Sequence, residues 1–179
     1  MMVDDTYWMG IALREAKKAA ARGEVPIGAV VVLDGQVLAR GHNLRETQDD
    51  PTAHAELVAI RKAAKKIGGW RLNGATLYVT LEPCIMCMGA ILLARVARVV
   101  YGCSDPKGGA AGSLYDLSAD RRLNHRVELA AGVRETECST VLSGFFSTLR
   151  SRKKSHTING EVSEWSMVPD SKSGVPKGT

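Results

Sequence analysis

The sequence Thr80-Leu81-Glu82-Pro83-Cys84-Ile85-Met86-Cys87 marks the change from a strand to a helix. Residues 75–80, which lead into it, are rich in apolar and β-branched types and predict a strand. After the proline, an apolar run continues to about residue 94 and predicts a helix. Cys84 and Cys87, three positions apart, would lie on one side of that helix. The segment therefore predicts a helix whose first turn presents two thiols.

A second helix start lies upstream, in Asp50-Pro51-Thr52-Ala53-His54-Ala55-Glu56. We expect a helix from about residue 53 to residue 66, with Thr52 as its N-cap. His54 and Glu56 are two positions apart, so on a regular helix their side chains would point about 200° apart. Both can face one metal ion only if the ion lies beyond the end of the helix. The spacing therefore predicts a metal site at the helix terminus.

One histidine and two cysteines, His54, Cys84 and Cys87, form the predicted ligand set. At a helix N-terminus the partial positive charge lowers thiol pKa values and favours the thiolates that zinc requires. Three protein ligands leave the fourth tetrahedral position for water, which is the catalytic arrangement of zinc. A structural site would need a fourth ligand, and Cys103 and Cys138 are the other two cysteines of the chain. We expect one catalytic Zn²⁺ and no nucleotide cofactor.

Glu56 is the predicted general acid and base. Zinc lowers the pKa of a bound water towards about 7, and Glu56 would take that water's proton. The same carboxyl group would deliver protons to a ring nitrogen and to the departing amine, which suits hydrolytic deamination. The combined pattern, H-x-E with P-C-x-x-C, is typical of zinc-dependent nucleobase deaminases.

The remainder of the chain alternates between strand and helix patterns, which predicts an α/β domain. Asp34 and Gly35 form a hairpin turn signal between two of the strands. The helix that follows Cys84 is apolar almost all round, so we expect it to be buried on several sides, either by a partner subunit or within the monomer. The predicted helices are 6–22, 53–66, 83–94 and 133–150, and the predicted strands are 26–33, 36–41, 75–80, 97–102 and 126–131.

Composition limits the class of protein. The chain has 179 residues, of which 45% are hydrophobic, enough for one compact domain. We expect a zinc-dependent deaminase domain over residues 1–154 and a flexible tail over 155–179, where Ser, Gly, Pro, Lys and Glu dominate. No membrane span and no secretory signal are predicted, and the cysteine pattern favours a cytoplasmic protein. The formal net charge of +5 is compatible with a polyanionic partner such as RNA.

Further motifs extend beyond the metal-binding pattern. The stretches concerned are E-V-P-I-G-A-V (24–30), D-P-T-A-H-A-E (50–56), T-L-E-P-C-I-M-C (80–87), G-A-A-G-S (109–113) and N-H-R-V-E (124–128), and together they cover the chain from about residue 5 to residue 152. On these stretches the chain resembles the bacterial tRNA-specific adenosine deaminases, within the cytidine deaminase-like superfamily. The zinc motif alone specifies only the superfamily, whereas the resemblance of the later stretches indicates the tRNA branch.

The resemblance implies a three-layer α/β/α sandwich around a central mixed five-stranded sheet. It also implies deamination of the wobble adenosine to inosine in the anticodon stem-loop of an arginine tRNA, by a homodimer with one zinc per subunit. Asn43 matches an asparagine that hydrogen-bonds the purine, and its alternative reading is a turn residue. Asp105 and Lys107 match residues near the anticodon backbone. A lysine beside two glycines suits a phosphate contact, and the alternative is a solvated loop charge.

Two other functions stay open at this level. The first is a free nucleoside or guanine deaminase on the same fold, and the second is a non-catalytic zinc-containing RNA-binding subunit. Glu56 argues against the second, because a structural zinc site has no use for that carboxylate. Basic residues at 150–154 either flank the RNA stem or are solvated. Phe145 and Phe146 either border the site or pack in the core.

Overall fold

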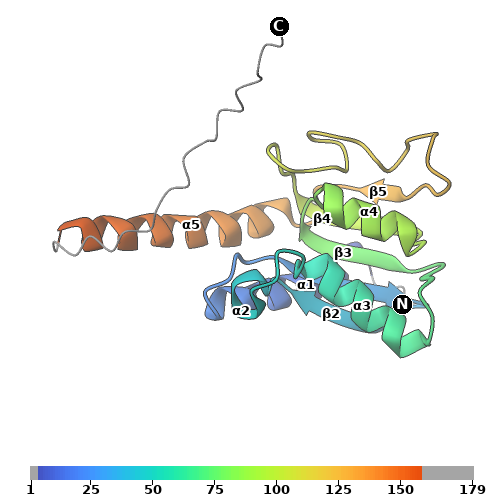
Figure 1. Ribbon diagram of the computed structural model, residues 1–179, viewed down its shortest axis with the longest axis horizontal. Helices are drawn as coiled ribbons and strands as arrows, with labels where there is room; N and C mark the ends of the chain where they lie inside the picture. Colours follow the sequence, from blue (N-terminus) through green and yellow to red (C-terminus); the bar gives the residue numbers. More distant parts are fainter. Residues whose placement is uncertain (1–3, 159–179) are drawn as a thin grey trace, which may run out of the picture.

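The computed structural model describes residues 4–158, and side chains as far as residue 152. Five strands form one sheet, and helices pack on both of its faces (Figure 1). Among the described residues no helix is long and apolar enough to cross a membrane. The elements are α1 (Asp5–Ala21), β1 (Gly28–Leu33), β2 (Gln36–His42), α2 (Arg45–Gln48), α3 (Ala55–Ile67), β3 (Thr76–Leu81), α4 (Ile85–Leu93), β4 (Arg98–Cys103), β5 (Glu128–Ala130) and α5 (Glu135–Ile158).

The sheet has the strand order β2-β1-β3-β4-β5. β1 runs antiparallel to β2 and β3, whereas β3, β4 and β5 run parallel to one another. The hairpin between β1 and β2 turns at Asp34 and Gly35, which both adopt positive φ (50° and 69°), as the sequence predicts. The mixed five-stranded sheet is therefore confirmed.

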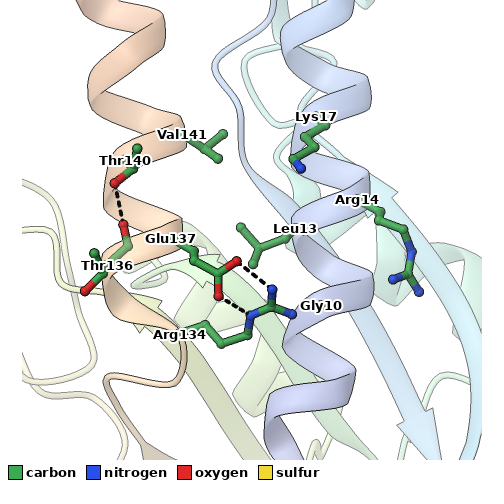
Figure 2. A pocket seen from close by; sticks show the side chains of 9 residues that line it. All are labelled: Gly10, Leu13, Arg14, Lys17, Arg134, Thr136, Glu137, Thr140 and Val141. Atoms are coloured by element: carbon green, nitrogen blue, oxygen red, sulfur yellow. Dashed lines mark hydrogen bonds and ion pairs between the residues drawn. The ribbon is translucent and has the colours of Figure 1, made fainter.

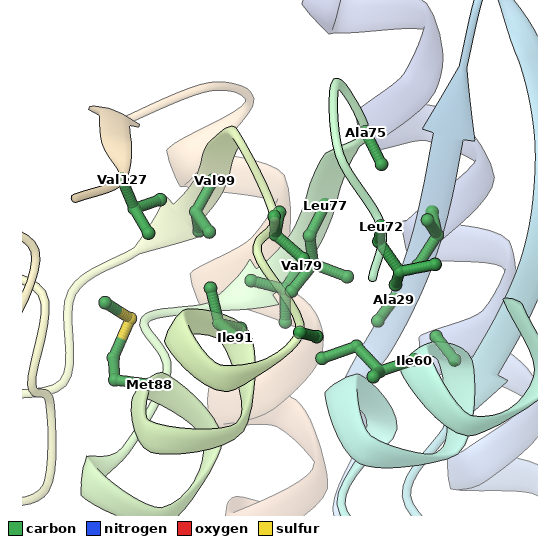
Figure 3. Packing of buried hydrophobic residues seen from close by; sticks show 14 of the residues in the cluster. Ala29, Ile60, Leu72, Ala75, Leu77, Val79, Met88, Ile91, Val99 and Val127 are labelled. Atoms are coloured by element: carbon green, nitrogen blue, oxygen red, sulfur yellow. The ribbon is translucent and has the colours of Figure 1, made fainter. Parts of the chain in front are cut away.

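Two apolar layers form because side chains along a strand alternate between the faces of the sheet. In β1, Ala29 and Val31 join the core cluster under α3 and α4, whereas Val30 and Val32 join the cluster under α1 and α5. Figure 3 shows the first cluster, where Ile91 of α4 packs among residues of β3 and β4. The three-layer α/β/α sandwich is therefore confirmed.

The structure corrects two of the predicted helix termini. Thr52 is not the N-cap of α3, because its hydroxyl donates to the Asp50 carboxylate (2.7 Å) and the helix begins two residues later, after His54. α5 continues to Ile158, eight residues beyond its predicted end, since no glycine or proline interrupts residues 151–158. Residues 155–158 of the predicted tail are thus helical, and residues 159–179 lie outside the described part of the chain.

Candidate metal centre and active site

Two helix N-termini carry the predicted ligand residues. His54 is the N-cap of α3 (φ −72°, ψ 152°), and Cys84 is the N-cap of α4 (φ −74°, ψ 174°). The carbonyl group of each accepts the first hydrogen bond of its helix. Gly41 of β2 allows α3 to lie this close to the sheet, because a Cβ atom there would be 2.3 Å from the carbonyl oxygen of Ala55. His54 and Cys84 therefore each precede the first turn of their helix, and the two helices lie on the same face of the sheet.

The three predicted ligand side chains lie together. The Nδ1 atom of His54 is 3.7 Å from the Sγ of Cys84 and 3.6 Å from the Sγ of Cys87. All three ligand atoms lie within 4.8 Å of one another. A tetrahedral zinc site with its usual bond lengths separates nitrogen and sulfur ligands by about 3.5–3.8 Å. The donor types and their spacing therefore fit a zinc ion.

The two thiols have different electrostatic surroundings. Hydrogen bonding with Cys87, supported by the His54 imidazole, lowers the pKa of Cys84 to about 4. The interaction with Cys84, together with burial, raises the pKa of the Cys87 thiol. The hydrogen bond to Cys84 also raises the pKa of His54. The lowered pKa of Cys84 favours its thiolate, which is the form of cysteine that binds zinc.

Glu56 lies in the first turn of α3, with only 4% of its surface exposed. Burial raises the pKa of its carboxyl group to about 7, and the nearby Cys84 adds to the rise, whereas His54 opposes it. A carboxyl group whose pKa is near the working pH can both accept and donate a proton. Glu56 therefore has the surroundings that a general acid and base requires.

Asn43 follows β2 and is buried, with 3% of its surface exposed. Its side-chain Nδ2 donates to the Oε2 atom of Glu24 (3.4 Å). The backbone N–H of Leu44 donates to the carbonyl oxygen of Ala53 (3.0 Å), the residue before His54. Asn43 therefore lies in a buried segment beside the ligand-bearing one, and not in an exposed turn.

Sequence reasoning misses two buried glutamates next to these segments. Glu24 is fully buried and also accepts hydrogen bonds from the backbone N–H groups of Thr47 (2.6 Å) and Glu46 (3.3 Å) in α2. Burial alone would raise the pKa of Glu24, but these hydrogen bonds hold it below its ordinary value. Glu82, which is also buried, accepts hydrogen bonds from the loop that follows β4. The sequence signal that could have found both glutamates is that each is an isolated acidic residue beside an apolar stretch.

Asp105 and Lys107 lie in the loop after β4. The Asp105 carboxylate accepts a hydrogen bond from the backbone N–H of Lys107 (3.0 Å), whereas the Lys107 side chain is exposed. Both residues line a groove of about 630 Å³ between this loop and α5, to which Phe146 and Arg150 also contribute. The Phe146 ring is exposed and not packed in the core. An exposed ring among cationic side chains suits a nucleic-acid ligand.

A second groove, of about 400 Å³, lies between α1 and α5 (Figure 2). Arg134 and Glu137 occupy it and are joined by two hydrogen bonds of 2.6 Å. A Cβ atom at Gly10 would lie 2.4 Å from the guanidinium group of Arg134. Since α1 and α5 cover the face of the sheet opposite to α3 and α4, this groove is separate from the metal-binding cluster.

Comparisons with known proteins agree with this geometry. Residues 3–150 match the model of the MafB19-like deaminase family. The tRNA-specific adenosine deaminase of Bacillus subtilis (strain 168) is 54% identical over 158 residues, which cover 88% of this chain and 98% of that protein. The tRNA-specific adenosine deaminase of Haemophilus influenzae is 50% identical over 151 residues, covering 84% of this chain and 87% of that protein.

Two solved structures share the fold. One comes from a study of A-to-I editing by tRNA:A34 deaminases at the wobble position, with a TM-score of 0.72 and 47% identity over 76% of this chain and 99% of that chain. A guanine deaminase from Nitrosomonas europaea has a TM-score of 0.71 at 20% identity, over 82% of this chain and 87% of that chain. At that identity the second likeness shows the fold alone.

The fold and the site together define a deaminase of the cytidine deaminase-like superfamily. Two relatives that match over most of their length, at 54% and 50% identity, show which family within this superfamily the chain belongs to. The chain belongs to the family of tRNA-specific adenosine deaminases. The resemblance that its motifs indicate is therefore confirmed.

Proposed function

We propose that this enzyme deaminates the wobble adenosine of a tRNA anticodon loop to inosine, with an arginine tRNA as the expected substrate. The observation that carries the proposal is the buried Glu56 beside the cluster of His54, Cys84 and Cys87. The 47%-identical structure, described as a tRNA:A34 deaminase acting at the wobble position, supports the choice of nucleotide.

The three ligand residues would hold one zinc ion per subunit through His54 Nδ1 and the two cysteine sulfurs. When bound, zinc supplies a Lewis acid that activates water for attack on the ring carbon. Glu56 accepts the proton of that water and passes it to the adjacent ring nitrogen. A second proton transfer through Glu56 reaches the departing amine, so that water and adenosine yield inosine and ammonia. One carboxyl group can serve both steps because its pKa is about 7.

Asn43 is the residue that we propose to bind the purine. The Glu24 carboxylate accepts a hydrogen bond from the amide nitrogen of Asn43 (3.4 Å), so the amide oxygen points away from Glu24. That oxygen is then available as an acceptor for a hydrogen bond from the base.

The groove beside α5 is the proposed path of the RNA backbone. Lys107 and Arg150 supply positive charge, and Phe146 supplies a ring on which a base can stack. Deamination requires that the adenine leave the base stack, and an anticodon loop offers unpaired nucleotides at low unstacking cost. A tRNA substrate and reduced cysteine ligands both suit the cytoplasm.

We also propose a homodimer formed through α4. Ile85, Gly89 and Leu93 follow one another at four-residue spacing, and Ile85 and Leu93 are 50% and 73% exposed. An exposed apolar stripe on a helix whose other residues include the buried Cys87, Met88, Ile91 and Leu92 is typical of a subunit interface. The neighbouring Met88 does not belong to this stripe, because it is fully buried in the core of the monomer.

Inosine formation tests the proposed substrate. The purified protein should deaminate an anticodon stem-loop of arginine tRNA much faster than free adenosine or free guanine. Equal or greater activity on the free compounds would overturn the tRNA assignment in favour of a nucleoside or guanine deaminase. RNA binding without any turnover would instead indicate a non-catalytic subunit.

A further inference from the structure

The Glu82 carboxylate organises the loop that follows β4. Only 2% of Glu82 is exposed. Its Oε2 atom accepts a hydrogen bond from the backbone N–H of Asp105 (2.9 Å), and its Oε1 atom accepts from those of Ala111 and Ser113 (3.0 Å each). The Ser113 hydroxyl donates a fourth hydrogen bond to Oε2. One side chain thus satisfies three backbone N–H groups spread over nine residues of the loop.

Glu82 also stands two residues before a predicted metal ligand. Its backbone N–H donates to the carbonyl oxygen of Cys103 at the end of β4 (2.8 Å). The next residue, Pro83, accepts a hydrogen bond from the backbone N–H of Ala110 (2.8 Å). Cys84 itself forms a β-bridge with Gly109. The loop is therefore attached directly to the backbone segment that carries the ligand.

Gly109 shows how closely the loop approaches this carboxylate. A Cβ atom at Gly109 would lie between 2.3 and 2.6 Å from three atoms of the Glu82 carboxyl group. Any side chain at position 109 would clash with the Glu82 carboxylate, so the loop can lie this close only because position 109 is a glycine.

We propose that Glu82 is a positioning residue that fixes Asp105 and Lys107 relative to the metal-binding cluster. The inference rests on the proposed function, in which this loop contacts the RNA backbone and the cluster carries the reaction. A loop held at three points by one buried anion keeps Lys107, the proposed phosphate contact, at a constant distance from the reacting base. Glu82 acts through the loop and need not touch the substrate.

The first experiment compares Glu82→Gln with the unaltered protein in kinetics on the anticodon stem-loop. The amide would place a donor against backbone donors, so at least one hydrogen bond of the loop is lost. We expect KM to rise at least about tenfold, with kcat changed less than about threefold and zinc content unchanged. Ser113→Ala, which removes one of the four donors, should shift KM in the same direction by less.

Ser118→Ala is the matched control, since the Ser118 hydroxyl donates to Asp116 (2.6 Å) and not to Glu82. Its KM should equal that of the unaltered protein. A Glu82→Gln variant that loses zinc, or that loses kcat at constant KM, would overturn the proposal, because Glu82 would then serve the metal centre itself.

A second pair of variants uses the contact with Gly109. Gly109→Ala alone should raise KM as Glu82→Gln does, because the new methyl group displaces the loop. In a Glu82→Ala background there is room for that methyl group, so the added effect of Gly109→Ala should be smaller. Strictly additive effects would contradict the proposed coupling.

Amide hydrogen exchange separates this inference from the proposed function. In Glu82→Gln the backbone N–H groups of Asp105, Ala111 and Ser113 should exchange faster than in the unaltered protein, whatever the substrate. Unchanged exchange at all three would overturn the positioning role. If the unaltered protein fails to deaminate the stem-loop while exchange accelerates in the variant, the proposed function fails and the loop-positioning role stands.

Discussion

The Nδ1 atom of His54 lies 3.6 Å from the Sγ atom of Cys87, although the two residues are 33 positions apart in the sequence. His54 precedes the first turn of α3, and Cys87 lies in the first turn of α4. α3 and α4 pack on the same face of the sheet, and the contacts of His54 with Cys84 and Cys87 bring their N-termini together. A metal ion held by this pair would therefore bridge the ends of two helices that β3 separates along the chain.

Removal of one ligand should abolish stable zinc binding. We expect Cys87→Ser to weaken zinc binding at least about 100-fold, because a hydroxyl is a poor zinc ligand. Metal content of the purified protein, measured by mass spectrometry, reports the result. Cys103→Ser is the control: this thiol donates to the carbonyl oxygen of Thr80 (3.4 Å), a contact that serine can keep, so zinc content should stay at one per chain. Full zinc occupancy in Cys87→Ser would refute the ligand set.

Glu56→Gln should separate metal binding from chemistry. The amide keeps the size of the side chain but cannot shuttle a proton, so kcat should fall by about 10²–10⁴-fold. Zinc content and affinity for the stem-loop should be unchanged. Glu128→Gln, which alters an exposed carboxylate on β5, is the comparison and should keep normal turnover. Survival of activity in Glu56→Gln would show that another group moves the proton.

Asp5 should make the stability of the protein depend on pH. Its carboxylate accepts two hydrogen bonds from Arg98 (2.8 Å each) and one from the Tyr78 hydroxyl (2.8 Å). The Arg98 hydrogen bonds, partly opposed by burial, lower the pKa of Asp5 from its ordinary value of 3.8. A lowered folded-state pKa stabilises the protein fully above that ordinary value, and the contribution is lost as pH falls through the folded pKa.

Asp5→Asn should therefore reduce the free energy of unfolding by about 1–2 kcal/mol at pH 7, since the pair is partly exposed. The difference from the unaltered protein should shrink as the pH falls below 3.8. Urea unfolding at several pH values measures both. Asp34→Asn, at an exposed turn position, should change stability by less than about 0.5 kcal/mol. A pH-independent deficit in Asp5→Asn would mean that the carboxylate charge is not the cause.

A charge on the exposed stripe of α4 should dissociate the proposed dimer. Leu93 is 73% exposed in the monomer, so Leu93→Glu should leave the fold intact while placing an unpaired carboxylate in the interface. Sedimentation analysis should then find monomers at concentrations where the unaltered protein is dimeric. Trp70→Glu changes another exposed apolar residue, outside α4, and should leave the dimer unaffected. A monomeric unaltered protein would contradict the proposal directly.

The sequence predicts those features that depend on short spacings. The i, i+3 cysteines and the H-x-E pattern place donor atoms relative to a local helix, whose geometry is constant. The alternation of strand and helix patterns likewise predicts the layered fold. The prediction of Thr52 as the N-cap of α3 was wrong, because the Thr52 hydroxyl forms a hydrogen bond with the Asp50 carboxylate instead of with the backbone of the helix. The first turn of α3 is thus shifted by two residues without disturbing His54.

Contacts between distant segments were decided only by the tertiary structure. Glu82 meets Ser113 across 31 residues and Glu24 meets Asn43 across 19, distances over which no periodic pattern carries information. The same holds for α4, whose composition is apolar almost all round: packing against the sheet buries Met88 and leaves Leu93 exposed. Residue types and local spacing therefore determined the chemistry of the site. The packing of helices, strands and loops against one another decided which further side chains surround the site, because burial and long-range hydrogen bonds exist only once the chain has folded.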